Sequence, residues 1–164
     1  MKQGLLMKEK ILLMLLFFLP FFSSLMAQVS ISILKNTDMN FGTIAVSSGA
    51  GTVLLSASGS RTPSGGVILP FFTGTVTAAQ FTVSGETNYT YAITLPATDF
   101  TLYESGVGPA SMIVNAFTSI PSATGTLTGG TETVLVGATL NVVASQAAGS
   151  YTNATGFEVI VNYN

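Results

Sequence analysis

The last nine residues of the chain, GFEVIVNYN at positions 156–164, indicate the fold class. Phe157, Val159, Val161 and Tyr163 occupy every second position and point one way, whereas the residues between them point the other way. This alternation is typical of a β-strand with one buried face. The chain therefore ends on a structural strand whose partners have to lie upstream.

Similar patterns recur along the chain, and no segment after residue 27 has helical periodicity. Apolar or alternating runs are separated by loops rich in Gly, Ser, Thr and Asn, which predicts an all-β sandwich or barrel. The expected strands lie within residues 29–34, 39–46, 51–58, 66–69, 77–84, 89–96, 111–119, 133–145 and 156–163.

Two antiparallel pairings can be argued from the sequence. Pairing Val83 with Tyr89, and Phe81 with Tyr91, leaves residues 84–88 as a loop and keeps the apolar side chains on one face. Residues 139–144 also alternate, and their short connection to the last strand predicts a second hairpin. Gly137, just before them, either kinks one long strand or separates two.

The first 27 residues have the character of a secretory signal peptide. Three lysines precede an uncharged apolar run at residues 11–22, and the segment closes on a small residue. The run is shorter than the roughly 20 apolar residues that span a bilayer. We expect cleavage near residue 27 and a single domain over residues 28–164, exported to the periplasm, cell surface or medium and not inserted in a membrane. An uncleaved anchor is the alternative.

Charged residues make up only 7% of the chain, where roughly 25% is ordinary. Residues 28–164 contain two basic and six acidic side chains, a formal net charge of −4. This balance argues against a nucleic-acid partner, because phosphate binding needs clustered cations. A weakly charged surface repels copies of itself little, which fits a protein packed against others, although a neutral secreted domain would have the same composition.

The chain has neither histidine nor cysteine. It therefore lacks the commonest general base, a thiol nucleophile and most ligands of transition metals. The acidic residues are scattered singly, without the spacing of a glycosidase pair or a calcium loop. The sequence predicts no catalytic activity, no cofactor and no metal site.

An alternating strand is also expected close to the start of the predicted mature chain, at VSISIL, residues 29–34. Val29, Ile31 and Ile33 alternate there with serines. A strand at a free N-terminus can pair within its own sheet, or it can complete the sheet of a neighbouring molecule. Both interpretations are open from the sequence.

Four segments carry a resemblance to a known family: NFGTIAV (40–46), SGSRTPSGGV (58–67), FTVSGETNYTYAITLP (81–96) and residues 136–164. In this order they resemble the bacterial domain of unknown function 4402 family, whose members are secreted or surface proteins without an assigned activity. The family is distantly similar to spore coat protein U and to fimbrial subunits of the chaperone–usher type. The resemblance implies an immunoglobulin-like antiparallel β-sandwich of about seven to nine strands.

The resemblance also implies candidate assembly residues. In those fimbrial subunits the last strand alternates and ends on a penultimate aromatic, which an assembly chaperone recognises. The candidate C-terminal recognition strand here comprises Phe157, Val159, Val161 and the penultimate Tyr163. The candidate N-terminal assembly strand comprises Val29, Ile31 and Ile33. The implied partners are further copies of the chain, other surface subunits and a periplasmic assembly chaperone.

Two functions follow as hypotheses. The first is a structural subunit of a fimbria-like surface appendage or of a coat, which would assemble by exchange of the N-terminal strand. The second is a stand-alone binding module for sugars or a surface partner, with contacts among the aromatics Tyr89, Tyr91, Tyr103 and Tyr151.

Overall fold

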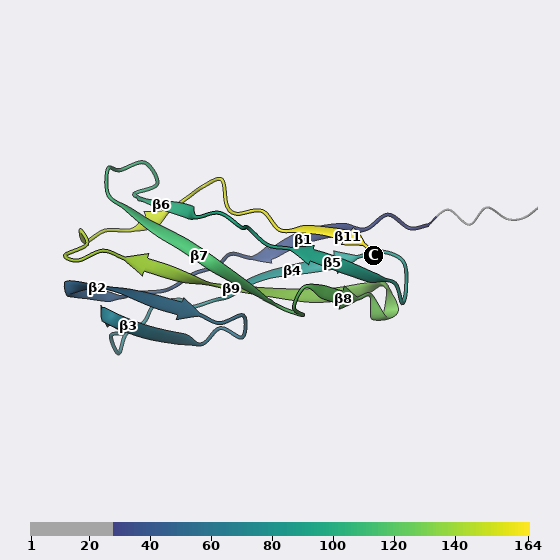
Figure 1. Cartoon of the computed structure of the whole chain (residues 1–164), viewed down its shortest axis with the longest axis horizontal. Coiled ribbons are helices and arrows are strands. Elements are labelled where there is room, and N and C mark those ends of the chain that lie inside the picture. Colours follow the sequence, from purple (N-terminus) through teal and green to yellow (C-terminus); the bar gives the residue numbers. More distant parts are fainter. Residues whose placement is uncertain (1–27) are drawn as a thin grey trace, which may run out of the picture.

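The computed structural model describes residues 28–164, and the expected signal peptide at residues 1–27 lies outside the described residues. The regular secondary structure of the described part is almost entirely antiparallel strand, arranged in two sheets (Figure 1), which confirms the expected all-β sandwich. Eleven strands form. This differs from the nine expected segments in two ways. Three short strands without clear alternation are added, at residues 100–104, 124–126 and 151–152, and the expected segments 39–46 and 51–58 contribute a single strand, at residues 45–55.

Eight strands make up the larger sheet. Its path runs β1–β4–β9–β7–β6–β10, and β2 joins it by pairing with β9 and with β3. The bounds are Ser32–Thr37 (β1), Ala45–Leu55 (β2), Arg61–Ile68 (β3), Ala79–Ser84 (β4), Phe100–Glu104 (β6), Ser111–Ile120 (β7), Thr131–Val142 (β9) and Tyr151–Thr152 (β10).

The smaller sheet has three strands in the order β11–β5–β8. A short 3-10 turn at Thr128–Gly130 leads from β8 back to β9 in the larger sheet. The bounds of the three strands are Thr90–Thr94 (β5), Thr124–Thr126 (β8) and Ile160–Tyr163 (β11).

Strand β9 organises the larger sheet. Its first half pairs with β4 and its second half with β2, while β7 runs along its other edge. Gly137 stands where the partner changes. A Cβ atom there would lie 2.2 Å from the carbonyl oxygen of Leu55, so only glycine lets the end of β2 approach this closely. Gly137 therefore lies within one continuous strand.

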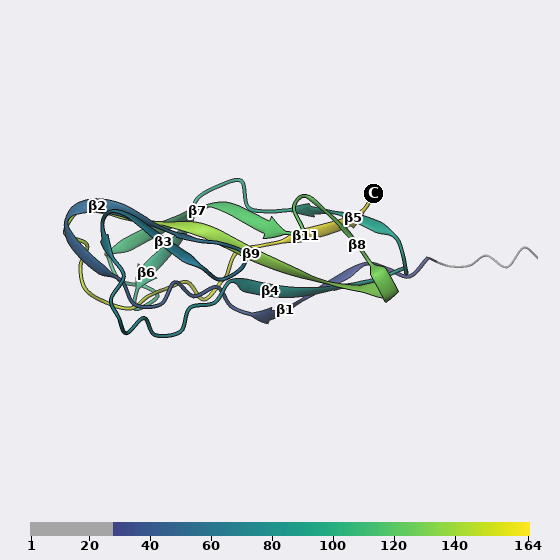
Figure 2. The same ribbon diagram turned by 90° about the horizontal axis from the view of Figure 1, so that it is seen from below.

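Two clusters of buried side chains form the interior. The first fills the space between β4 and β9 on one side and the smaller sheet on the other, and Figure 2 shows these layers from below. The second is formed by side chains of the larger sheet, from β2, β3, β7 and β9, together with Phe41. Met39 and Phe117 pack against both clusters and join them.

The expected hairpin between residues 81–83 and 89–91 is wrong. Strand β4 pairs with β1 and β9, whereas β5 pairs with β11 and β8, so the connection between β4 and β5 crosses from one sheet to the other. The apolar positions still share a core, because the two strands face each other across the sandwich. Phe81 and Val83 lie in the same cluster as Tyr91 and Ile93.

The expected partner of the last strand is also wrong. Strand β11 pairs with β5, with Val161 opposite Ile93 and Tyr163 opposite Tyr91. Residues 139–142 instead pair with β2 and β7, so both edges of β9 are already occupied. The connecting segment adds β10 to the edge of β6 and then carries the chain to the smaller sheet.

Candidate functional site

The two segments proposed from the sequence to serve assembly lie close together. Strand β1 is one edge of the larger sheet, β11 is an edge of the smaller sheet, and the two strands are in contact (Figure 1). We call this region the terminal junction, and define it as residues 29–33, the loop residues 85–86 and residues 157–163. It brings the first and last described strands to the same side of the sandwich.

The first side of the junction is β1, which has a single neighbour, β4. Ile33 lies opposite Val83, and the side chains of Ile31 and Ile33 pack against the core between the sheets. Leu34 points outward and is 69% exposed. Val29 precedes the strand, and its side chain is exposed. Its contacts with Tyr163 and Glu86 are made by its backbone carbonyl and N–H groups.

The second side is the C-terminal segment, in which the expected alternation is present. Val159 and Val161 are buried, and the residues between the inward positions are exposed. Phe157 inserts among three other aromatic rings, with its centroid 5.0 Å from that of Phe117, 6.1 Å from that of Phe100 and 6.2 Å from that of Phe81. Burial of this ring anchors the segment before β11 begins.

Tyr163 links the two sides. Its hydroxyl donates a hydrogen bond to the carbonyl oxygen of Val29, at 2.7 Å, and accepts one from the backbone N–H of Glu86, at 2.6 Å. The N–H of Val29 in turn donates to the Glu86 carboxylate at 3.1 Å. These bonds join the N-terminal segment, the loop after β4 and the C-terminal strand.

Gly85 makes room for this arrangement. A Cβ atom at this position would lie 2.3 Å from the Tyr163 hydroxyl oxygen. The ring of Tyr89 also packs edge-on against that of Tyr163, with centroids 5.7 Å apart. The sequence analysis singled out Tyr163 but not Gly85 or Glu86. No local pattern at Glu86 indicates that its backbone N–H bonds to a residue 77 positions further along the chain.

A second polar link between the sheets was also missed. The hydroxyl of Tyr91, fully buried on β5, donates to the carboxylate of Glu132 on β9 at 2.8 Å. The same carboxylate oxygen accepts the N–H of Thr126 on β8. Burial, and then the hydrogen bond and negative charge of Glu132, raise the pKa of Tyr91 well above its usual range. The neutral phenol holds the two sheets together.

The four tyrosines proposed as binding contacts do not form one surface. Tyr91 is inaccessible, and the hydroxyl of Tyr151 donates to the carbonyl of Ala147 in the loop that precedes β10. Tyr89 and Tyr103 are about half exposed, but they belong to elements at opposite ends of the sandwich (Figure 1). A flat aromatic platform for a sugar ring is therefore not assembled from them.

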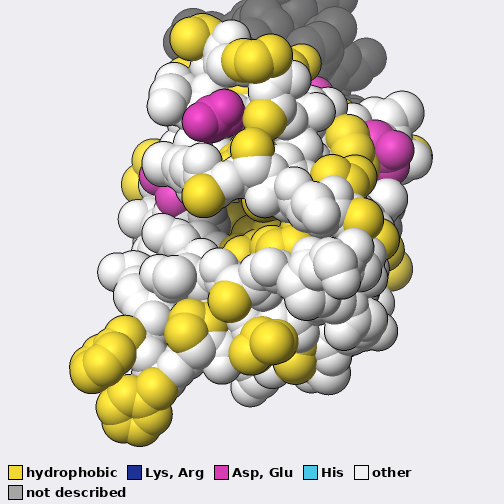
Figure 3. All heavy atoms as spheres, turned by 90° about the vertical axis from the view of Figure 1, so that its left-hand side faces the viewer, with side chains coloured by type: hydrophobic (Ala, Val, Ile, Leu, Met, Phe, Trp, Pro, Cys, Tyr) yellow, Lys and Arg dark blue, Asp and Glu magenta, His cyan; other side chains and the backbone are white. Residues whose placement is uncertain are grey.

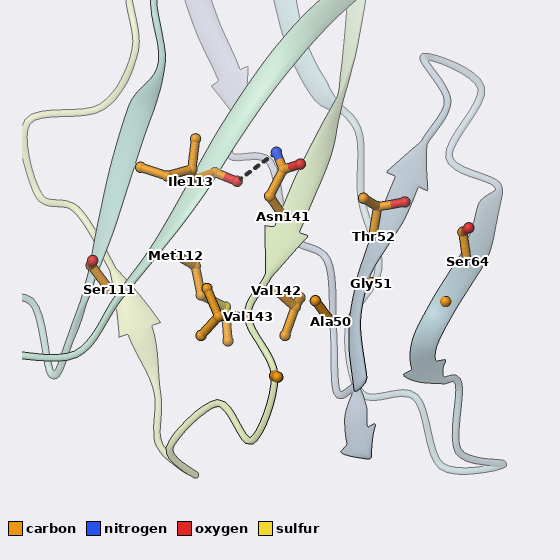
Figure 4. Close-up of a pocket in the computed structure, with 12 residues that line it drawn as sticks. Ala50, Gly51, Thr52, Ser64, Ser111, Met112, Ile113, Asn141, Val142 and Val143 are labelled. Atoms are coloured by element: carbon orange, nitrogen blue, oxygen red, sulfur yellow. Dashed lines mark hydrogen bonds between the residues drawn. The ribbon is translucent and has the colours of Figure 1, made fainter. Parts of the chain in front are cut away.

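The end of the molecule away from the terminal junction carries an open groove of about 560 Å³. It lies where β2, β7 and the last residues of β9 meet (Figure 4), and none of its lining residues is charged. On its polar side the amide of Asn141 donates to the carbonyl of Ile113. We call this hollow the end groove.

Within residues 28–164, no three carboxylate, histidine or cysteine side chains lie close enough together to hold a metal ion. The same part of the chain contains no helix that is long and apolar enough to cross a bilayer.

The fold and the terminal junction define a two-sheet antiparallel β-sandwich whose first and last strands are joined at one side. A family model described as a domain of unknown function, DUF4402, matches residues 31–163, and the chain belongs to this family. Searches of the curated proteins and of the solved structures found no match.

Proposed function

We propose that this protein is a non-catalytic structural protein of the cell exterior, whose copies join by exchanging their N-terminal strands. The observation that carries the proposal is the position of β1. It is a short edge strand near the start of the described chain, and its inward side chains complete the core beside β11. An identical strand from a second copy can make the same contacts, which is the basis of domain swapping.

The contacts of β1 define what an exchanged assembly would contain. The pairing of Ile33 with Val83 and the bond between Tyr163 and Val29 would then join two different chains. The isolated bridge between Asn40 and Thr77 holds the chain just after β1, so the hinge would lie at Asp38 and Met39. Exchange would have to release the hydrogen bond from the Thr77 hydroxyl to the carbonyl of Asp38 and the packing of Met39 on the core. Short hinges favour exchange, because the strand cannot relax within its own molecule.

Two further features support this proposal. The low charge of residues 28–164 lets copies approach without strong repulsion. Export of the protein is expected from the signal peptide predicted at residues 1–27. A periplasmic assembly chaperone remains part of the proposal, because β11 has only β5 as a neighbour within the described residues and so offers an unpaired edge.

The proposal can be tested by trapping the exchanged strand. The chain lacks cysteine, so a pair introduced at Ser32 and Ser84, which lie opposite each other in β1 and β4, reports only on this contact. Ser32→Cys and Ser84→Cys would be made in separate chains, mixed, allowed to assemble and oxidised. We expect covalent heterodimers far in excess of either homodimer.

A matched control places the second cysteine at Thr62, which pairs with Leu54 in the β2–β3 hairpin, on a strand that does not pair with β1. The Ser32→Cys and Thr62→Cys chains should give no excess of heterodimer. If the Ser32 and Ser84 chains also give none, and a chain carrying both cysteines forms only an internal disulfide, strand exchange is wrong. Electron microscopy of producing cells, with and without the protein, would test its role at the surface.

A further inference from the structure

Two adjacent phenylalanines project from the loop that connects β3 with β4. Phe71 is 93% exposed and Phe72 is 83% exposed, and their rings contact each other edge-on with centroids 5.1 Å apart. Two such rings expose on the order of 300–400 Å², which is the size of the largest apolar patch on many monomeric proteins. Patches of this size mark places where a protein meets another protein or a membrane. We call this pair the aromatic tip.

The base of the loop is anchored, so the aromatic tip is presented in a defined position. The N–H of Thr43 donates to the carbonyl of Thr73 at 2.6 Å, and Asn40 bridges to Thr77. Gly42 packs so closely on Thr73 that no side chain would fit there. The exposed rings therefore follow directly from an ordered connection, and the loop folds without covering them.

The loop that carries the aromatic tip begins at the end of the sandwich that is farther from the terminal junction. It leaves β3 after Ile68, which is itself exposed and pairs with Ala45 at the start of β2 (Figure 1). Figure 3 looks onto this end of the molecule, where hydrophobic side chains project from one corner and the acidic side chains in the view lie away from that corner. A contact made by the tip therefore leaves β1 and β11 free.

The loop offers no charge to a partner. No charged residue occurs between Arg61 and Glu86 in the sequence. Residues 28–164 contain two basic side chains, and both are already bonded: Lys35 to the carboxylate of Asp38 at 2.6 Å, and Arg61 to two backbone carbonyls. Clustered cations would draw a protein to an anionic surface. The partner of the tip is instead recognised by apolar contact alone.

We infer that the aromatic tip inserts into a lipid surface with neutral head groups. The shape of the tip favours lipid over protein as the partner. Two projecting rings need a matching pocket in a folded protein surface, whereas fluid acyl chains close around a projection of any shape. Phenylalanine is among the residues that interfacial segments bury at the boundary of head groups and acyl chains, roughly 5–10 Å deep. The contact is peripheral, because only the tip enters the lipid.

The size of the tip sets the expected strength of binding. A single myristoyl chain binds membranes with an association constant of about 10⁴ M⁻¹, which is marginal and reversible. Two phenyl rings remove less apolar surface from water than this chain does, so about 10²–10³ M⁻¹ is expected for one molecule. Binding should therefore be measurable at millimolar lipid and reverse on dilution.

The tip can be followed directly, because the chain contains no tryptophan. Phe72→Trp would be made in a chain that starts at residue 28, since the apolar run at residues 11–22 would itself bind lipid. With phosphatidylcholine vesicles at about 5 mM lipid, we expect the indole emission to shift to shorter wavelength. Lipids brominated in the upper part of their acyl chains should quench this emission, because quenching requires contact between the bromine and the ring.

Leu34→Trp is the matched control, since Leu34 is also well exposed but lies on β1, beside the terminal junction. Its emission should not change when vesicles are added. Vesicle flotation gives a second readout, in which Phe71→Ser with Phe72→Ser should bind at least about tenfold more weakly than the wild-type chain. Replacing about a third of the phosphatidylcholine by phosphatidylserine should weaken wild-type binding, because six acidic side chains face two basic ones in residues 28–164.

The inference is wrong if vesicles leave the emission of the Phe72→Trp variant unchanged, if Leu34→Trp shifts equally, or if binding requires the anionic lipid. A shift that grows with protein concentration in the absence of lipid would identify a second protein molecule as the partner and would also overturn it. None of these readouts depends on exchange of β1, so this contact and the proposed function can fail independently.

Discussion

The hydroxyl of Tyr163 lies 2.7 Å from the carbonyl oxygen of Val29, which joins residues 134 positions apart in the chain. The hydroxyl oxygen of Tyr163 also accepts a hydrogen bond from the N–H of Glu86. A single phenol therefore joins the N-terminal segment, the loop after β4 and the C-terminal strand. The strand that the sequence suggested for assembly is thus fastened by the residue that it suggested for recognition. Any release of β1 has to break this contact.

Replacing Tyr163 by Phe should therefore loosen the N-terminal segment. The variant keeps the ring packed against Tyr89 but leaves the Glu86 N–H without its acceptor, which should lower the free energy of unfolding by about 1–3 kcal/mol. Urea unfolding measures this loss, and faster amide exchange at residues 29–33 would localise it. Tyr103→Phe, at an exposed position, should change stability by less than about 0.5 kcal/mol. Equal losses for the two variants would contradict the role of Tyr163.

The orientation of β1 predicts different outcomes at two neighbouring positions. Ile33→Asp places a carboxylate against the core and should cost about 2–4 kcal/mol of stability, whereas Leu34→Asp on the exposed face should cost less than about 1 kcal/mol. Thermal and urea unfolding of both variants provide the measurement. A similar cost at both positions would mean that β1 does not lie with Ile33 inward.

Gly137 should tolerate no side chain. Gly137→Ala brings a methyl group to 2.2 Å from the carbonyl oxygen of Leu55, and the end of β2 has to shift away from β9, at an expected cost of about 3 kcal/mol or more. Gly49→Ala is the control, because its Cβ atom would meet nothing closer than 3.7 Å. Denaturant unfolding of the two variants should separate them clearly, and a neutral Gly137→Ala would show that β2 and β9 are not this close.

The link between Tyr91 and Glu132 predicts a loss of stability in alkaline solution. The folded state raises the pKa of Tyr91 above the ordinary value of 10.0, so the unfolded chain loses this proton at a lower pH than the folded chain does. The stabilisation is fully present below pH 10 and is lost progressively as the pH rises above it. Urea unfolding between pH 8 and about 11 should show this decline.

Tyr91→Phe should make stability less dependent on pH in that range, although the variant is less stable at neutral pH because Glu132 loses a hydrogen-bond donor. Tyr103→Phe should keep the wild-type decline. A wild-type protein whose stability is constant from pH 8 to about 11 would show that Tyr91 ionises as easily in the folded state as in the unfolded state.

Much of the fold could be predicted from local patterns. The strands at residues 79–84 and 131–142 and the inward face of residues 157–163 follow from alternation, because a strand with one buried face has to place apolar side chains at every second position. The shorter β8 and β10 escaped prediction. They contain three and two residues, too few to show a period, and they exist because neighbouring strands offer unpaired backbone groups.

The sequence did not indicate which strands pair with each other. Both wrong pairings joined segments that are close in the chain, whereas β4 and β5 lie in different sheets and β11 pairs with β5 across a long separation. Alternation specifies which side chains face a core but not which strand supplies the neighbouring hydrogen bonds. A face-to-face arrangement buries Phe81 and Tyr91 as well as a hairpin would.

By itself, then, the amino-acid sequence determined an antiparallel all-β architecture, the inward residues of its main strands and the inward face of residues 157–163, to which Tyr163 belongs. Only the tertiary structure decided that the two ends of the described chain meet at Tyr163, that Glu132 ties the sheets together and that Phe71 and Phe72 stay exposed. The physical reason is that side-chain periodicity is a local property, while hydrogen-bond partners, close glycine contacts and exposure depend on how distant segments pack.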